Sequence, residues 1–110
     1  MIADAGDLVW SDFSPTLGTE QSGRRPALIL SSRAYNIASG RSIVCPVSST
    51  RGDWAWNLPL PPGLATKGVV LVDQVRAVHN ESRLFRFLER VPDEFLDEVR
   101  LRLAPLVGLR

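Results

Sequence analysis

The chain has 110 residues, of which 45% are apolar and 23% are charged, a balance typical of a single globular domain over residues 1–110. No apolar run approaches the roughly 20 residues that span a bilayer. Residues 1–7 carry acids where a secretion signal needs bases, so we expect a cytoplasmic protein with no membrane partner. A single Cys and a single His exclude an internal disulfide, a cysteine zinc site and any His pair.

Charge is unevenly spread along the chain. The net charge is −4 over residues 1–20, +6 over residues 21–90 and −1 over residues 91–110, which gives +1 in total. All basic residues except one are Arg, whose planar guanidinium suits phosphate, so the basic middle is compatible with nucleic-acid binding. Charge alone favours the simpler interpretation, in which these side chains form a solvated surface.

Short apolar, β-branched runs bounded by Gly, Pro, Ser or charged residues predict a series of strands. In chain order, we expect strands over residues 8–13, 27–30, 42–47, 54–58, 69–72, 75–78 and 84–88. One long helix is predicted over residues 92–106, because Pro92 and Asp93 suit a first turn and apolar residues recur at helical spacing behind them. This pattern indicates a mainly β fold, a small bent sheet or barrel, with a C-terminal α-helix.

The most unusual stretch is the polar, Gly-flanked loop 18–26, which leads directly into a predicted buried strand. Pro26 favours an extended conformation at Arg25, and Glu20 on the same loop can fold back to meet Arg25. A carboxylate that takes a proton and a guanidinium that stabilises charge on phosphorus oxygens suit phosphoryl chemistry without a metal. An ion pair that only holds the loop has the same spacing, and spacing alone favours it.

A second polar cluster follows the strand at residues 42–47. Ser48 can donate to a phosphate oxygen, but a cap at the strand end is the better interpretation of this residue by itself. The lone His79 has no evident partner for a serine-hydrolase triad. Trp54 and Trp56 would share one face of a strand, where they can stack on bases or serve as core or dimer-interface aromatics, with neither interpretation favoured.

Several segments spread almost end to end form a specific set of motifs. They are residues 6–10 (GDLVW), 12–15 (DFSP), 18–31 (GTEQSGRRPALILS), 35–36 (YN), 44–49 (VCPVSS) and 68–76 (GVVLVDQVR). A D-x-x-P, G-x-E-Q-x-G-x-R-P series before a buried strand is hard to obtain by chance, and the segment at residues 68–76 adds independent support. With these motifs the chain resembles the MazF/PemK family, the toxins of bacterial type II toxin–antitoxin pairs.

The resemblance implies a fold and an activity. The fold would be a compact SH3-like β-barrel with a C-terminal helix, assembled as a homodimer. The activity would be metal-independent and cofactor-free cleavage of single-stranded RNA at a short sequence. The 2′-hydroxyl would attack its own phosphate and leave a 2′,3′-cyclic phosphate and a 5′-hydroxyl.

The resemblance also implies site residues and a partner. Arg25 would be the catalytic arginine, Glu20 its acid–base partner or the group that orients it, and Ser48 a hydroxyl standing where the family commonly has Thr. Gln74 and Arg83 fall at positions where relatives contact RNA. We also expect RNA contacts from Gln21, Ser49, Trp54, Trp56 and Arg76, but no specific base contact is carried over to the two tryptophans, because Asp53 breaks the usual spacing there. A cognate antitoxin with a disordered acidic segment would fold over the RNA site and block it.

Three other functions fit the sequence less well. A gyrase poison of the same fold would act through a terminal aromatic residue, whereas this chain ends Val107-Gly108-Leu109-Arg110 and carries the Glu20–Arg25 block. An SH3-like peptide-binding module would not explain a polar cluster centred on Arg25. An inactive family member would carry the same motifs, since a motif is not an activity.

Overall fold

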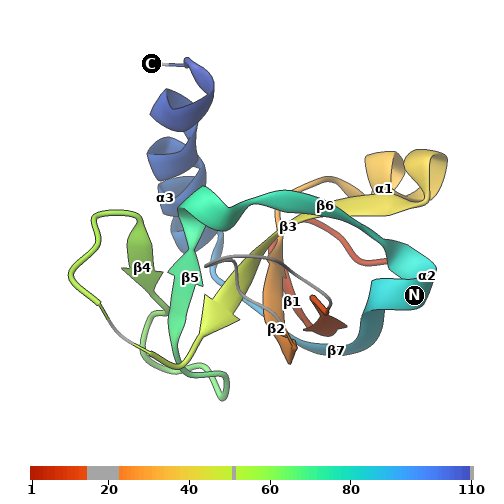
Figure 1. Ribbon diagram of the computed structural model, residues 1–110, viewed down its shortest axis with the longest axis horizontal. Coiled ribbons are helices and arrows are strands. Elements are labelled where there is room, and N and C mark those ends of the chain that lie inside the picture. Colours follow the sequence, from red (N-terminus) through yellow and green to blue (C-terminus); the bar gives the residue numbers. More distant parts are fainter. Residues whose placement is uncertain (15–22, 51, 110) are drawn as a thin grey trace.

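The computed structural model describes residues 1–14, 23–50 and 52–109. Within these ranges the chain is mainly β, with one long helix towards the C-terminus (Figure 1). The strands are β1 (Asp7–Asp12), β2 (Arg24–Ile29), β3 (Arg41–Ser48), β4 (Asn57–Pro59), β5 (Val69–Leu71), β6 (Arg76–His79) and β7 (Leu84–Arg90). The helices are α1 (Arg33–Ser39), α2 (Asn80–Arg83) and α3 (Asp93–Leu103), with 3-10 turns η1 (Val72–Gln74) and η2 (Ala104–Val107).

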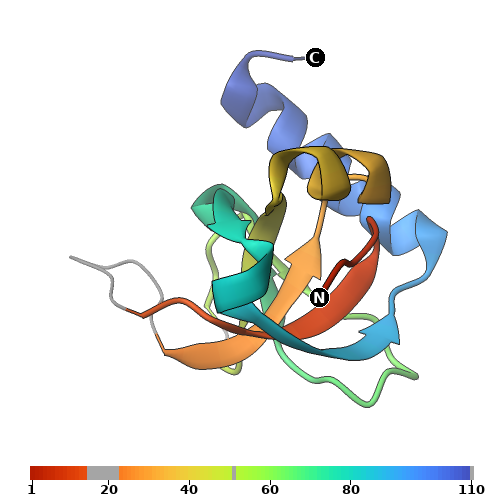
Figure 2. The ribbon, with the colours of Figure 1, turned by 90° about the vertical axis from the view of Figure 1, so that its right-hand side faces the viewer.

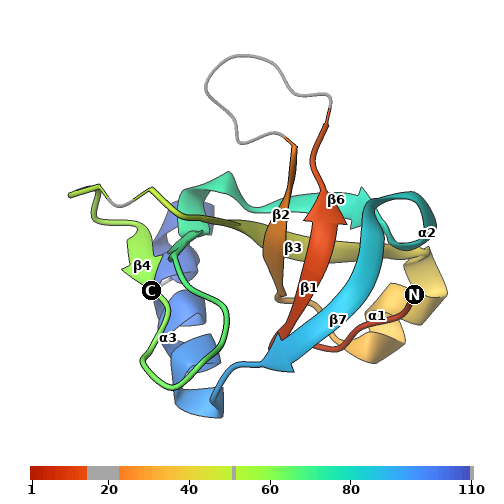
Figure 3. The same cartoon turned by 90° about the horizontal axis from the view of Figure 1, so that it is seen from below.

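The strands form one antiparallel sheet with the hydrogen-bonded order β4-β5-β3-β2-β1-β7. Strand β6 pairs with the first half of β3, and β5 pairs with its last residues, both on the edge away from β2. The sheet curls strongly, and α2 carries the chain from β6 to β7 (Figure 3). Within the described residues no hydrogen-bonded pair joins β7 to β6 or to β4. The mainly β fold with a C-terminal helix is therefore confirmed, but the sheet is not closed into a barrel.

The central strands form because they are apolar on both faces. Successive residues of β1 point to opposite sides, so Leu8 and Val9 enter two different buried clusters. The helix-side core lies between the sheet and α3 and contains Leu8, Leu28, Leu30, Cys45, Val47, Val70, Val72, Val91, Leu96 and Val99. The inner core fills the concave face of the curled sheet and contains Ala3, Val9, Phe13, Ala27, Ile29, Val44, Val78 and Leu84.

The predicted C-terminal helix is present, and it ends as its sequence requires. Leu96 and Val99 of α3 are buried in the helix-side core, while Pro105 lies in η2, where the α-helix has given way to a 3-10 turn. The last turns extend beyond the sheet (Figure 2) and leave Leu106 and Val107 exposed. Among the described residues, no helix has both the length and the apolar character needed to cross a membrane.

The structure differs from the expected secondary structure at α1 and just before β4. The sequence pattern did not indicate α1, a seven-residue helix that begins where the Ser32 hydroxyl accepts from the Tyr35 N–H and ends at Gly40 in the left-handed conformation. The strand expected over residues 54–58 is instead β4 at Asn57–Pro59. A turn closed by a hydrogen bond from the Asn57 N–H to the Trp54 carbonyl replaces its first half, so Trp54 and Trp56 do not share a strand face.

Candidate active site

The concave face of the curled sheet is apolar along most of its length and polar at one end. On this face of β1, Ser11 lies two positions after Val9. On the same face of β2, Arg25 lies two positions before Ala27, and both polar residues are next to the ends of their strands. In β3 and β6 the corresponding residues beyond Val44 and Val78 are Ser48 and Arg76. These four polar residues lie where the 14–23 connection and the loop after β3 leave the sheet.

Strand register brings Arg25 and Ser48 to neighbouring positions. Arg25 lies opposite Ser11, whose hydroxyl donates to the Arg25 carbonyl at 2.8 Å. Ala27 lies opposite Pro46, and the same antiparallel register carried two residues further sets Arg25 opposite Ser48. Arg25 is half-buried and Ser48 is buried, and both lie at the edge of the inner core.

Ser48 serves the local fold as well. Its hydroxyl accepts a hydrogen bond from the Thr50 N–H at 3.1 Å, which is the strand-end cap that its position predicts. Gly68 packs directly on the Ser48 carbonyl: a Cβ at Gly68 would lie 2.4 Å from that oxygen, and the φ of +132° there suits glycine. The backbone that carries Ser48 is therefore held from two sides.

Arg76 and Arg83 lie together at the base of the 14–23 connection. The Arg76 guanidinium stacks over the Phe13 ring at 4.4 Å from its centroid, and Arg83 donates to the Ser14 carbonyl. Both arginines line a cleft of about 190 Å³ with Asp12 and His79. The Ser14 N–H holds the pKa of the Asp12 carboxyl below its usual 3.8, and charges on Arg24 and Arg83 lower it further. Glu20 and Gln21, predicted for the site, lie outside the described residues.

The two tryptophans have different surroundings, although their ring centroids are 5.3 Å apart. Trp56 packs against the helix-side core and donates its indole N–H to the Arg102 carbonyl at 3.1 Å. Trp54 is 56% exposed and donates to the Asp73 carboxylate at 2.6 Å. Gln74 follows Asp73 in η1, on the way to Arg76 in β6.

A second cleft, of about 250 Å³, opens behind Arg25. Its lining includes Trp10, Arg24, Arg25, Pro26, Ser49 and Lys67. Arg25 and Ser49 were expected at the site, whereas Arg24, although it is next to Arg25, and Lys67 were not singled out. Trp10 and Pro26 lie directly opposite one another on β1 and β2 and form one wall of this cleft. In the part of the chain that the structure describes, no three His, Cys, Asp or Glu side chains gather as a metal site.

Comparisons with known proteins agree with this geometry. The family model described as the PemK-like, MazF-like toxin of type II toxin–antitoxin systems matches residues 4–107. The endoribonuclease toxin MazF of Escherichia coli K12 is 34% identical over 107 residues, with 97% of this chain and 96% of that protein covered. The endoribonuclease toxin ChpB of the same organism is 37% identical, with 94% and 93% covered.

Solved structures give the same result. A crystal structure of MazF from Deinococcus radiodurans superposes with a TM-score of 0.94 at 43% identity and covers 99% of each chain. A MazE–MazF structure from the same organism superposes with a TM-score of 0.85 at 39% identity, covering 100% of this chain and 99% of that one. The chain therefore belongs to the PemK-like, MazF-like toxin family of type II toxin–antitoxin systems.

Proposed function

We propose that this protein is an endoribonuclease toxin that cuts single-stranded RNA at a short sequence without a metal ion and that a cognate antitoxin neutralises it. The proposal is carried by the arrangement of Arg25 and Ser48 on neighbouring strands, at the polar end of the inner face. Relatives that match almost the whole chain are named endoribonucleases, which supports the reaction class.

The proposed reaction is an intramolecular transesterification. The 2′-oxygen attacks the adjacent phosphorus, a P–O2′ bond forms, and the P–O5′ bond breaks. The proton of the 2′-hydroxyl passes to a base, and the departing 5′-oxygen takes up a proton. The products are a 2′,3′-cyclic phosphate and a 5′-hydroxyl, and this step consumes no water.

Each proposed site residue has a defined task in that step. The Arg25 guanidinium stabilises the charge that develops on the non-bridging phosphorus oxygens, and the Ser48 hydroxyl donates to one of them. Glu20 either accepts the 2′-proton or orients Arg25. When the RNA is held with its 2′-oxygen in line with the P–O5′ bond, the attacking and leaving groups are already oriented within one molecule. No second reactant then has to be brought to the site.

RNA on either side of the scissile bond would contact the residues that surround this centre. Trp54 offers an exposed aromatic face on which a base can stack, while Trp56 supports it from the core. The remaining proposed contacts are Gln21, Ser49, Gln74, Arg76 and Arg83. Unstacked bases of a single strand can reach such groups, whereas the bases of a duplex cannot.

Two further proposals concern assembly, in the cytoplasm where the RNA substrate is found. An antitoxin with a disordered acidic segment would bind the basic surface of residues 21–90, which carries a net charge of +6. A homodimer is supported by the exposed apolar residues Leu101, Leu106 and Leu109 at the C-terminal end of the chain. Light scattering on the purified protein distinguishes a dimer from a monomer.

Cleavage of a mixed single-stranded RNA by the pure protein in excess EDTA tests the reaction. We expect fragments that end in a 2′,3′-cyclic phosphate from the wild type and none from Arg25→Ala. Arg41→Ala is the matched control, because Arg41 is exposed at the opposite end of β3 from Ser48. Equal cutting by Arg25→Ala would contradict the site, and no cutting across several long RNAs would favour a gyrase poison or an inactive module.

Glu20→Gln in the same assay tests whether the Glu20 carboxylate takes part in the reaction. Loss of cleavage comparable to that of Arg25→Ala would support a part in the reaction, either in proton transfer or in orienting Arg25. Unchanged cleavage would reduce Glu20 to a residue that holds the loop.

A further inference from the structure

Lys67 occupies an unusual position, where three clefts meet. The first is the cleft behind Arg25, the second continues over Trp10 and Pro26 to Arg86, and the third passes Ser49 towards the prolines at residues 59, 61 and 62. Their volumes are about 250, 390 and 410 Å³, and Lys67 lines all three. Lys67 is also the only lysine of the chain, and it is exposed.

The loop that carries Lys67 is held in place by hydrogen bonds. The Glu89 carboxylate on β7 accepts from the Thr66 N–H at 2.6 Å and from the Ala65 N–H at 3.1 Å. The Leu60 N–H donates to the Gly68 carbonyl at 3.0 Å and closes the base of the loop. Lys67 itself donates to the Leu64 carbonyl at 2.8 Å. These hydrogen bonds hold the loop against β7 and place the Lys67 ammonium beside the Leu64 carbonyl.

The charge around these clefts is strongly positive. Arg24, Arg25, Lys67 and Arg86 all line them. Among the described residues that line the three clefts the one carboxylate is Glu89, and both of its oxygens accept from loop amides. Cations beside aromatic and flat apolar surface, here Trp10 and Pro26, form the kind of surface that follows the backbone of single-stranded nucleic acid.

We propose that Lys67 binds a backbone phosphate of a nucleotide that flanks the scissile bond, in a subsite next to Arg25. The inference rests on the proposed function, in which Arg25 contacts the scissile phosphate. The neighbouring phosphates of the same strand must then lie within a few nucleotides of Arg25, and the first cleft leads from Arg25 directly to Lys67. An acidic peptide is not covalently joined to a group that is held at Arg25, so nothing comparable brings it to this cleft. RNA is therefore the favoured occupant.

Binding of an RNA that cannot be cut measures this contact directly. The probe is a single-stranded RNA that the wild type cuts, made with 2′-deoxyribose at the scissile nucleotide, and its affinity is followed by fluorescence anisotropy over a range of salt. We expect Lys67→Gln to weaken binding roughly 5-fold at low salt and to reduce the slope of log K against log[salt] by about 0.7, the value for one phosphate contact on a single strand.

The choice of variants separates charge from loop shape. Lys67→Gln keeps an N–H donor for the Leu64 carbonyl and loses only the charge, whereas Lys67→Ala loses both. Arg41→Ala removes a comparable exposed charge far from the clefts, and we expect it to leave both the affinity and the salt slope unchanged. The cleavage rate at saturating RNA should stay within about 2-fold of wild type for Lys67→Gln, since the residue contributes to binding and not to the chemical step.

The phosphate itself can be located by neutralising RNA phosphates one at a time as methylphosphonates. One position near the scissile bond should weaken binding by the wild type and leave binding by Lys67→Gln unaffected. A wild type that cuts RNA while Lys67→Gln binds with wild-type affinity and salt slope would overturn the inference alone. Loss of poly-L-glutamate binding by Lys67→Gln with RNA binding unchanged would overturn it in favour of an acidic partner. A wild type that neither binds nor cuts RNA overturns the proposed function as well.

Discussion

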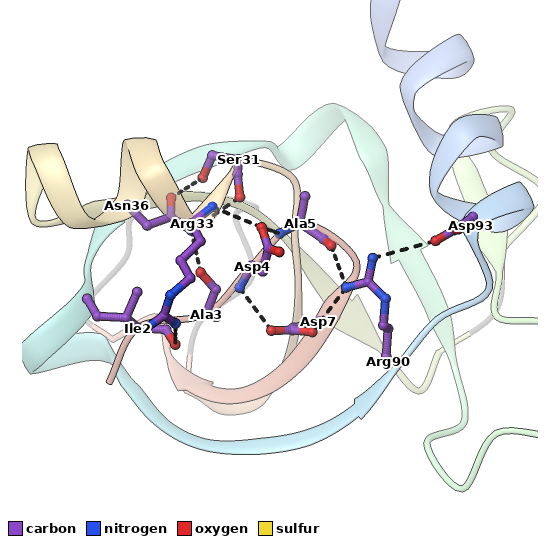
Figure 4. A network of polar contacts seen from close by, with 10 residues as sticks. All are labelled: Ile2, Ala3, Asp4, Ala5, Asp7, Ser31, Arg33, Asn36, Arg90 and Asp93. Atoms are coloured by element: carbon purple, nitrogen blue, oxygen red, sulfur yellow. Dashed lines mark hydrogen bonds and ion pairs between the residues drawn. The ribbon is translucent and has the colours of Figure 1, made fainter.

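The two ends of β1 differ in how their polar groups are used. At its start, Asp4, Asp7, Arg33, Asn36 and Arg90 form a network in which each contacts another part of the chain (Figure 4). At its end, the sheet presents Arg25 and Ser48 beside clefts whose described lining residues include more cations than carboxylates. One strand thus joins an end whose polar side chains hold the N-terminus and α1 to an end where, among the described residues, cations line open clefts.

The network at the start of β1 serves folding. The Asn36 amide N–H groups donate to the Ala3 carbonyl at 2.9 Å and the Ser31 carbonyl at 3.2 Å, and its amide oxygen accepts from the Ser31 hydroxyl. Arg90 forms ion pairs with Asp7 at 3.4 Å and Asp93 at 3.5 Å. The satisfied amide of the buried Asn36, with the more exposed contacts of Asp4, Arg33 and Arg90 around it, fixes α1 and the N-terminus on the sheet. At the other end, the described cations Arg24, Arg25, Lys67 and Arg86 line clefts that open to solvent, which is the reason to assign function there.

The largest effect on activity is expected at Arg25. Arg25→Ala should lower the single-turnover cleavage rate by about 10³-fold, and Arg25→Lys by about 10²-fold, because lysine keeps the charge but not the planar fork. The free energy of unfolding should change by less than about 1 kcal/mol, since Arg25 is only half-buried. Quench-flow or gel assays give the rates, and urea unfolding gives the stability. If Arg25→Lys cleaved RNA at the wild-type rate, a bidentate contact between the Arg25 guanidinium and the phosphate would not be required.

At the other end of β1, we expect a substitution to lower the free energy of unfolding and to leave cleavage unchanged. Asn36→Ala removes three hydrogen bonds from a buried site and should lower the free energy of unfolding by about 2–4 kcal/mol. Cleavage per folded molecule should stay at the wild-type level. Ile37→Ala is the control on the same helix, because Ile37 is 58% exposed and should change stability by less than about 0.5 kcal/mol. A large loss of cleavage in folded Asn36→Ala would show that the two ends are coupled.

The same contrast explains which parts of the structure were predictable. The strands β1, β2 and β3 were found from the sequence because runs such as residues 27–30 are apolar on both faces. Helix α1 was missed because it is short and is anchored by the buried amide of Asn36 rather than by an apolar stripe. The spacing of apolar residues in the sequence does not reveal a helix that is anchored by one polar side chain.

The site was only partly predictable for a related reason. Arg25 could be singled out because Pro26 and the Gly-flanked loop mark it in the sequence. Its position opposite Ser48 depends on the pairing of β2 with β3, which brings together residues that are far apart in the chain. Lys67 reaches the cleft only because Glu89, on a different strand, holds its loop. Neither the pairing of β2 with β3 nor the contact of Glu89 with the Lys67 loop leaves a pattern in the local sequence.

A moderate effect is expected at Ser48. Ser48→Ala should lower the cleavage rate by roughly 10-fold, as loss of one neutral donor to a phosphate oxygen does, and should weaken the turn at Thr50 by about 1 kcal/mol. Ser48→Thr restores the hydroxyl and should recover most of the cleavage rate. Ser49→Ala, at the exposed neighbouring position, should affect RNA affinity more than the rate at saturating RNA. Equal rates for wild type and Ser48→Ala would leave Ser48 with its capping role alone.

The smallest expected effect is a dependence of stability on pH that arises at Glu89. Hydrogen bonds from Thr66 and from the backbone N–H of Ala65 lower the pKa of the Glu89 carboxyl below its usual 4.5. Because the folded-state pKa is the lower one, this stabilisation is complete above the unfolded-state pKa and is lost as pH falls through the folded-state pKa. The wild type should therefore exceed Glu89→Gln in stability at neutral pH, and the difference should shrink below about pH 4.

Urea unfolding of the two proteins at several pH values measures that difference. Asp4, whose pKa is lowered chiefly by the Arg33 backbone N–H, loses its own stabilisation over a similar acid range in both proteins, so it cancels in the comparison. A difference that stayed constant down to pH 3 would mean that Glu89 does not hold the loop through its charge. If Glu89→Gln also weakened RNA binding while Lys67 was intact, the loop would be shown to place the Lys67 ammonium, because Glu89 adds a negative charge to the clefts and its removal alone should favour RNA.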